Sequence, residues 1–261
     1  MEPKGLVGGL YRISEWIMRL AVINILWLVC SIPFVFIAWS GLLAAPADTS
    51  DSAITSQVYA TLIMMAVIAP FTLFPATGAM FTIARKWVMG EVDVPMFKTF
   101  FRGYKENYLQ SMIGGIFYSL VLGVMIIDFV VYKEKFNLFS YLYLAIGLLL
   151  VVSLFNFFSM LVHYHMKTFQ LLKNAILITI GRPIRSFSTA IMAAAVMYFS
   201  TQYTFLIPFF MGSVIAYLSF WNFFMIYRKL QDQMDKEKQK AEEEQENEFA
   251  ELTDSERDRN Q

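Results

Sequence analysis

Three long stretches without any charged residue constrain the fold of this chain more than any other feature. Leu20–Ala47, Ala53–Ala84 and Ser186–Tyr227 are each long enough for an α-helix to cross the ~30 Å hydrocarbon core of a bilayer. The composition agrees, because 57% of the residues are hydrophobic and 16% are charged, whereas soluble domains average about 45–50% and about 25%. The sequence therefore predicts an all-α, polytopic helical membrane protein in contact with the lipid bilayer.

Six membrane spans account for these stretches and for two further apolar runs. Ser186–Tyr227 is too long for one span, and the polar Ser200-Thr201-Gln202 inside it predicts a hairpin. The expected spans are 20–45, 54–84 (kinked), 107–127, 137–162, 186–201 and 205–227. Together they form a transmembrane domain over residues 1–227. Residues 228–261 form a charged tail, which has too few apolar side chains beyond Ala241 to fold alone.

The first stretch also has features of a cleaved signal peptide, because Ala45-Pro46-Ala47 has the small residues of a cleavage site. However, the apolar run is longer than the roughly 7–15 residues of a signal peptide, and proline beside the cut is unusual. We therefore interpret the stretch as a retained membrane span.

Lysine and arginine are distributed unequally between the two sides of this topology. Of the 21 basic residues, only Lys133 and Lys135 lie on one side, and the rest lie before the first span, after the second and fourth, and in the tail. Because basic loops stay in the cytoplasm, we expect both termini to be cytoplasmic. A five-span topology would place the Arg228-Lys229 pair outside, which the same rule disfavours.

Proline and glycine interrupt the second stretch. Pro70, Pro75 and Gly78 lie within it, and proline kinks a helix because it removes one backbone hydrogen bond. Such a break is tolerated where neighbouring helices or water satisfy the freed carbonyl, so we expect residues 72–82 to face protein. Interrupted helices mark binding sites in transporters. The candidate pathway residues are Asn24, Thr72, Pro75, Thr77 and Gly78.

An aromatic stripe with basic flanks follows the second span. Aromatic residues recur there at helical spacing: Phe97, Phe100, Phe101, Tyr104 and Tyr108. Lys98, Arg102 and Lys105 fall on the other faces. We expect a short amphipathic helix, which either anchors at the cytoplasmic interface or docks a partner protein. The candidate docking residues are Phe97, Phe100, Phe101, Arg102 and Tyr104.

The boundaries of the short helices carry sequence signals too. Asp93 is expected to be the N-cap of the aromatic helix, with Pro95 in its first turn. A second short amphipathic helix is expected over 169–180, because Gly181 and Pro183 stop it. The fold then has two short cytoplasmic amphipathic helices.

Residues at membrane depth point to packing rather than chemistry. Gly115, Ser119 and Gly123 form a stripe of small residues that lets another helix approach closely. The polar residues at membrane depth are expected to hydrogen-bond between helices; they are Asn24, Asn156, Gln202 and Asn222.

The sequence offers little for catalysis or metal binding. His163 and His165 are two residues apart, whereas zinc ligands on one helix need a spacing of three or four. Cys30 is the single cysteine, and no G-x-S-x-G, P-loop or H-E-x-x-H motif is present. We therefore expect no enzyme activity, no catalytic or metal-binding residue and no cofactor. Since the net charge is zero, we also expect no nucleic-acid partner.

Several motifs together resemble the YesL family of bacterial membrane proteins, which is also catalogued as a domain of unknown function. They are Gly9-Leu10-Tyr11 with Trp16, Asn24-Ile25-Leu26-Trp27, Cys30-Ser31-Ile32-Pro33, Phe74-Pro75-Ala76-Thr77 with Ala79-Met80, Arg85-Lys86-Trp87, and the Phe97–Tyr108 segment. The resemblance covers the first half by motif and the rest by hydrophobic pattern. In similar proteins the Asn24 and Pro75 motifs lie closer together in the sequence, so the packing of the first two spans is expected to differ.

The resemblance implies a cellular place and an association. Genes for such proteins often neighbour carbohydrate-uptake transporters and polysaccharide-degrading enzymes, and no binding residues are established for the family. It implies a bacterial plasma-membrane protein of carbohydrate uptake, either an accessory of a carbohydrate ABC transporter or a small permease, alone or as a homo-oligomer. The alternative is a non-transporting scaffold that docks a partner through its basic-aromatic segments and charged tail.

Overall fold

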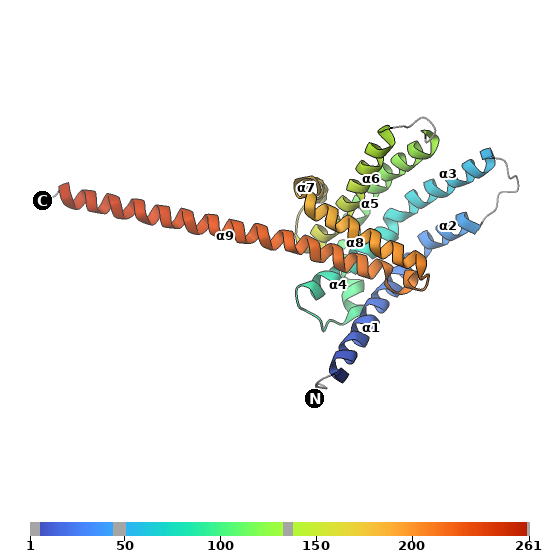
Figure 1. Cartoon of the computed structure of the whole chain (residues 1–261), viewed down its shortest axis with the longest axis horizontal. Helices are drawn as coiled ribbons and strands as arrows, with labels where there is room; N and C mark the ends of the chain where they lie inside the picture. The colour runs from blue at the N-terminus through green and yellow to red at the C-terminus, as the bar shows by residue number, and fades with distance from the viewer. Residues whose placement is uncertain (1–5, 44–50, 133–137, 260–261) are drawn as a thin grey trace. The chain divides into compact units, whose positions relative to one another are not determined.

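A computed structural model describes residues 6–43, 51–132 and 138–259, and throughout these ranges the chain is built from helices joined by short turns (Figure 1). The Ala45-Pro46-Ala47 motif lies outside the described residues, as do Lys133 and Lys135. The chain divides into two units, Met1–Asn222 and Phe223–Gln261.

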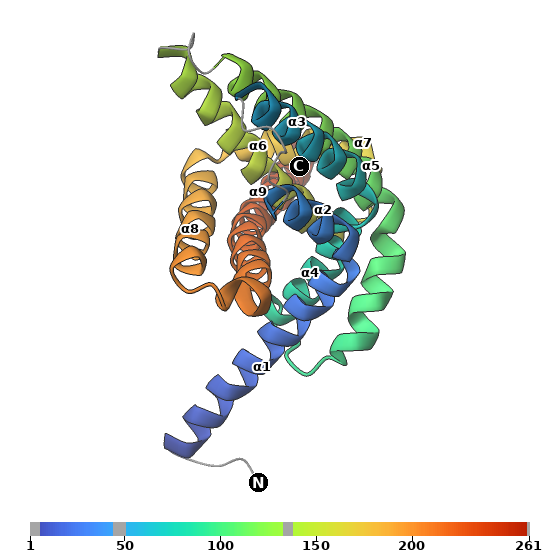
Figure 2. The same cartoon turned by 90° about the vertical axis from the view of Figure 1, so that its right-hand side faces the viewer.

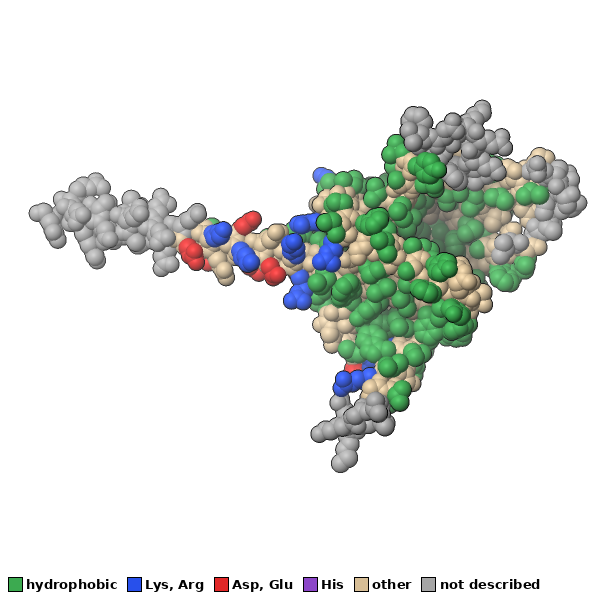
Figure 3. Space-filling view, in the orientation of Figure 1, with side chains coloured by type: hydrophobic (Ala, Val, Ile, Leu, Met, Phe, Trp, Pro, Cys, Tyr) green, Lys and Arg blue, Asp and Glu red, His purple; other side chains and the backbone are tan. Residues whose placement is uncertain are grey.

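The predicted class of all-α, polytopic membrane protein is confirmed. Five described segments are long and apolar enough to cross a membrane: Gly9–Cys30, Ser52–Phe71, Met96–Ile126, Tyr141–His163 and Ile207–Glu243. Apolar side chains cover most of the face of the first unit that Figure 3 shows. Helix α8 (Pro183–Gln202), at the predicted fifth span, is not among the five, so the number of spans stays a prediction.

The predicted first span consists of two helices. Helix α1 (Leu6–Cys30) begins well before residue 20, and α2 (Ile32–Leu43) follows after a break at Ser31. Pro33 explains the break, because it has no N–H to donate to the carbonyl of Val29 in the preceding turn.

The predicted kinked second span also consists of two helices. Helix α3 (Asp51–Ile68) and the 3₁₀ turn η1 (Ala69–Phe71) precede α4 (Leu73–Val88). Pro70 and Pro75 each lie in a first helical turn, where a backbone N–H has no partner to lose. Helix α4 buries most of its length, including Pro75 and Gly78, so the prediction that this segment faces protein is confirmed.

The aromatic segment is not a helix of its own. It forms the first turns of α5 (Met96–Tyr132), which continues through the predicted third span because no proline interrupts it. The prediction of Asp93 as N-cap is wrong, since the carbonyl of Pro95 accepts the N–H of Thr99 at 2.9 Å and Asp93 instead pairs with Arg19. One short amphipathic helix remains, α7 (Thr168–Gly181), which buries Leu171, Leu172, Ala175 and Thr179.

The stripe of small residues on α5 packs as predicted. A Cβ atom on Gly115 would lie 2.9 Å from the Cα of Pro70 and 2.7 Å from the ring of Phe74, so only glycine fits there. A Cβ on Gly123 would lie 3.8 Å from that of Ala66. Helix α3 therefore lies beside α5, as Figure 2 shows.

Helix α6 (Leu138–His163) runs antiparallel to α5. Tyr118 and Ser153 share a hydrogen bond of 2.7 Å, and Gln110 Nε2 donates to the carbonyl of Met166 at 2.8 Å. As the residue numbers of α5 increase from 110 to 118, the numbers of their partners decrease from 166, just after α6, to 153 within it.

The last part of the first unit contains α8, the π-helical turn η2 (Ile207–Met211) and the start of α9 (Gly212–Arg259). The turn before η2 comes directly after the predicted hairpin, at Tyr203–Phe205. In the second unit α9 stays helical beyond Ala241, where glutamate, lysine and glutamine favour a helix by propensity although few apolar residues remain.

Candidate functional site

Asn24 satisfies the backbone of the interrupted segment before α9. Its Nδ2 donates to the carbonyls of Ile207 and Pro208 at 3.1 and 2.7 Å, and its Oδ1 accepts the N–H of Ser213 at 2.9 Å. The asparagine side chain is fully buried. A π-helical turn that contains proline frees backbone groups, and a buried carbonyl without a partner is costly. The predicted role of Asn24 as an interhelical hydrogen-bonding residue is confirmed.

One helical turn farther along α1, Trp27 joins this helix to α4. Its Nε1 donates to Thr77 Oγ1 at 3.0 Å, and the threonine hydroxyl donates to the carbonyl of Leu73 at 2.7 Å. The bond spans 50 residues of sequence and brings together the two motifs that contain Asn24 and Pro75.

A cavity of about 200 Å³ lies beside the Trp27–Thr77 hydrogen bond. Among the described residues, those that line it include Trp27, Thr77, Phe158, Met211 and Ala216, and none of the lining residues is charged. Its two hydrogen-bonding side chains, Trp27 and Thr77, already bond to protein. The cavity is therefore apolar, and apolar cavities stay dry.

The five candidate pathway residues do not form one site. Thr77 lines the cavity and Asn24 borders it, since a Cβ on the lining residue Gly212 would lie 2.9 Å from Asn24 Oδ1. Thr72 donates to the carbonyl of Ile68 within the break. Pro75 is buried within α4, and Gly78 faces Ser111 of α5. The sequence analysis missed Trp27 as a site residue, although its spacing of three from Asn24 places both on one side of α1.

The aromatic segment extends past the end of α6. Because Gln110 donates to the carbonyl of Met166 and α6 ends at His163, the part of α5 that precedes Gln110 continues past the end of α6. Met96–Asn107, which we call the overhang, adds about 18 Å at 1.5 Å per residue.

The overhang has a packed face and an exposed face. Phe100 and Gly103 are buried, with Gly103 against Thr82 of α4, so Phe100 belongs to the core rather than to a docking surface. On the other side, Phe97 is 61% exposed and Phe101 is 52% exposed. Exposed cationic side chains flank them, namely Lys98, Arg102 and Lys105. Of the remaining candidates, Arg102 is thus exposed and Tyr104 is half-buried.

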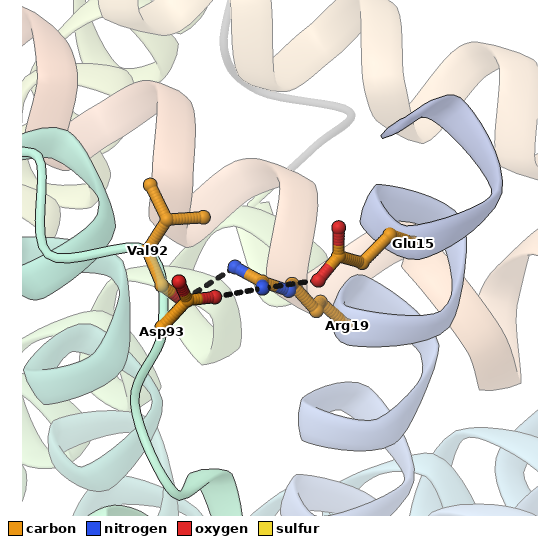
Figure 4. Close-up of polar contacts among 4 residues, drawn as sticks. All are labelled: Glu15, Arg19, Val92 and Asp93. Atoms are coloured by element: carbon orange, nitrogen blue, oxygen red, sulfur yellow. Dashed lines mark hydrogen bonds and ion pairs between the residues drawn. The ribbon is translucent and has the colours of Figure 1, made fainter. Parts of the chain in front are cut away.

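Arg19 holds the loop from which the overhang starts (Figure 4). Its guanidinium donates to the carbonyl of Val92 and pairs with Asp93 at 2.6 Å and with Glu15 one turn earlier on α1. Arg19 is buried, whereas the Asp93 side chain is 94% exposed. The same loop contains Gly90 at φ 95°, a conformation that suits glycine. The sequence does not predict this contact, because Val92 and Asp93 lie 73 and 74 residues from Arg19 in the chain.

The other predicted polar sites have mixed outcomes. Asn156 donates to Thr179 Oγ1 at 2.9 Å, and Asn222 donates to Thr189 Oγ1 at 2.6 Å, so both predicted interhelical bonds are confirmed. The prediction for Gln202 is wrong, because its side chain is exposed and bonds to no other described residue. Within the part of the chain that the structure describes, no three His, Cys, Asp or Glu side chains are placed to hold a metal.

The comparisons with known proteins assign a family. The family described as "Protein of unknown function, DUF624" matches residues 20–129. The uncharacterized protein YesV of Bacillus subtilis (strain 168) is 30% identical over 140 residues, which are 52% of this chain and 67% of YesV. The chain belongs to the DUF624 family. The matched range contains Asn24, Trp27, Thr77 and the whole overhang, whereas the partners of Asn24 at 207–213 lie outside it.

Two longer relatives support the same membership. The uncharacterized protein YteU of Bacillus subtilis (strain 168) is 28% identical over 220 residues, or 83% of this chain and 84% of YteU. The uncharacterized protein YesL of the same organism is 25% identical over 232 residues, or 88% of this chain and 95% of YesL. No solved structure gives a significant match.

Proposed function

We propose that this DUF624 protein is a non-enzymatic, non-transporting accessory protein of a bacterial plasma membrane, which holds a cytoplasmic partner through the overhang. The observation that carries the proposal is the exposure of Phe97 and Phe101 on turns of α5 that lie beyond the end of α6. Aromatic side chains and arginine are enriched in protein interfaces, and adjoining exposed aromatic side chains favour a partner. Lys98, Arg102 and Lys105 would select a partner with an acidic surface.

The interior favours an accessory over a permease. Asn24 donates to the carbonyls of Ile207 and Pro208 at the interrupted segment η2. At the break before α4, the hydroxyl of Tyr108 donates at 3.3 Å to the carbonyl of Phe71, four residues before Pro75. The cavity beside the Trp27–Thr77 hydrogen bond offers no unbonded polar side chain. A carbohydrate needs hydrogen-bonding partners for its hydroxyl groups in place of water, because burying a hydroxyl group without one is costly.

The nature of the partner comes from the resemblance to the YesL family, which implies carbohydrate uptake. We therefore propose a carbohydrate ABC transporter as the partner. The cytoplasmic position of the overhang, and of both ends of this sequence, comes from the charge distribution and belongs to the same proposal.

The test is co-purification of the tagged protein from its native membrane in mild detergent. We expect a stoichiometric transporter permease or ATPase with the wild type, and at least a tenfold loss of it when Phe97→Ala is combined with Phe101→Ala. The matched control combines Phe36→Ala with Phe205→Ala, two exposed phenylalanines elsewhere, and retains the partner. Equal capture by both double variants contradicts the overhang as the docking surface.

A second measurement addresses transport itself. Purified protein reconstituted in vesicles is expected to give no more uptake of labelled oligosaccharides than empty vesicles. Protein-dependent uptake that is lost in Thr77→Ala would contradict the accessory role. It would instead indicate a permease whose pathway passes the Trp27–Thr77 hydrogen bond.

A further inference from the structure

A second and larger hollow lies between α6 and α8. Its volume is about 430 Å³, and its walls are mainly apolar. Helix α6 contributes Leu148, Leu149 and Val152, and α8 contributes Ile184, Phe187 and Ala190. The hydroxyl of Ser186, which also lines it, donates to the carbonyl of Thr179 at 2.7 Å. We call this hollow the α6–α8 groove. Since its lining hydroxyl is already bonded, the groove favours hydrocarbon over water.

The rim of the α6–α8 groove is the most exposed apolar part of α8. Ile184 is 85% exposed and Phe187 is 65% exposed. The opposite wall belongs to Tyr141–His163, a segment apolar and long enough to cross the bilayer. The surroundings of the groove at that wall are therefore lipid rather than water.

An arginine precedes the first groove residue of α8 in the chain. Arg182 directly precedes Pro183, the first groove residue of α8, and is half-exposed. The next arginine, Arg185, is held by Asn222, to whose Oδ1 its Nη1 donates at 3.3 Å. Within the described ranges, neither arginine forms an ion pair with a carboxylate. Arg182 is thus available to an external anion.

We propose that the α6–α8 groove binds one anionic phospholipid, with an acyl chain along the groove and the phosphate against the guanidinium of Arg182. The planar guanidinium suits a phosphate oxygen pair, and basic sites beside membrane helices attract anionic headgroups. The apolar walls match the chain and the arginine matches the headgroup, so the two halves of the site fit a single molecule. This proposal concerns a surface separate from the overhang and does not depend on the proposed function.

The test is native mass spectrometry of the delipidated, full-length protein titrated with phosphatidylglycerol or with phosphatidylcholine of the same acyl chains. One favourable charge near the membrane surface predicts about a fivefold preference for phosphatidylglycerol in the wild type. Arg182→Gln removes the preference but leaves binding of both lipids. Arg102→Gln, which removes an exposed charge from the overhang, retains the preference. Equal binding of the two lipids by the wild type, or an unchanged preference in Arg182→Gln, overturns the proposal.

The position of the acyl chain in the α6–α8 groove is tested separately, with a variant whose larger side chain fills the groove. Ala190→Leu adds apolar volume to a lining residue, and we expect it to weaken both lipids several-fold without removing the preference for phosphatidylglycerol. Far-UV circular dichroism verifies that this variant stays helical. If it folds and binds both lipids like the wild type, the chain does not occupy the groove. If it does not fold, the headgroup arm with Arg182→Gln decides alone.

Discussion

The cluster of Asn24, Trp27 and Thr77 and the overhang of α5 both lie in the first unit. They differ in how many of their side chains contact other parts of the protein. Around Asn24, amide, indole and hydroxyl groups all bond to protein, and the neighbouring cavity is apolar. On the overhang, Phe97 and Phe101 are exposed between cations. A break in a membrane helix therefore does not by itself mark a binding site, because the fold can satisfy the freed groups internally. Exposed aromatic side chains beside charged ones, as on the overhang, are the better indicator of a binding site.

The largest expected effect is a loss of stability when the buried Asn24 is replaced. Asn24→Ala removes three hydrogen bonds and leaves two carbonyls and one N–H without their partner. Interhelical bonds of this kind contribute about 0.6–2 kcal/mol each in membranes, so we expect the free energy of unfolding to fall by about 2–4 kcal/mol. Denaturant unfolding of the protein in detergent measures the loss.

The control for this prediction is Gln202→Ala, because Gln202 is an exposed amide without a described partner. Its change in unfolding free energy is expected to stay within about 0.5 kcal/mol. Equal free energies of unfolding for the two variants would contradict the prediction that the buried bonds of Asn24 stabilise the protein.

The helical membrane class follows from the sequence because an apolar run in lipid must pair its own backbone groups, and a helix does so locally. The burial of residues 72–82 follows for a similar reason, since a break between helices leaves backbone groups that lipid cannot satisfy. The partners of Asn24 could not be predicted. They lie 183 to 189 residues away, so only the folded chain brings them together.

Continuity of helices was harder to predict than their presence. The aromatic segment and the third span form one helix, α5, although a change from basic to uncharged residues separates them in the sequence. Charge indicates where water is, but it does not end a helix; proline or glycine does. The overhang follows from this continuity together with the register of α5 against α6, which only the structure provides.

A smaller loss of stability is expected when Arg19, which holds the loop before the overhang, is replaced. Arg19→Gln removes the ion pairs with Glu15 and Asp93 and weakens the bond to Val92. Hydrogen bonds to charged groups contribute about 1.5–3 kcal/mol, but Asp93 is almost fully exposed, so we expect a loss of about 1–2 kcal/mol in unfolding free energy. Because the loop starts α5, capture of the partner by the overhang also falls.

The matched control is Arg102→Gln, which removes an exposed arginine from the overhang without breaking a described ion pair. Its unfolding free energy stays within about 0.5 kcal/mol of the wild type. If Arg102→Gln destabilises the protein as much as Arg19→Gln does, net charge rather than the tie to the loop explains the effect.

The smallest effect concerns Glu91, in the loop between α4 and the overhang. Lys86 lowers the pKa of Glu91 below its ordinary value of 4.5, first through a side-chain hydrogen bond and second through its charge. A carboxylate whose pKa is lowered by folding stabilises the folded state above its unfolded pKa, and this contribution is lost as the pH falls through the folded pKa. Lys86→Gln should therefore return the pKa of Glu91 toward 4.5 and flatten the stability curve only below that pH. Carbon-detected NMR titration of the glutamate side chain measures the shift. A Glu91 pKa that is unchanged in Lys86→Gln would mean that Lys86 and Glu91 form no fixed ion pair, and that the ion pair with Arg19 holds this loop without it.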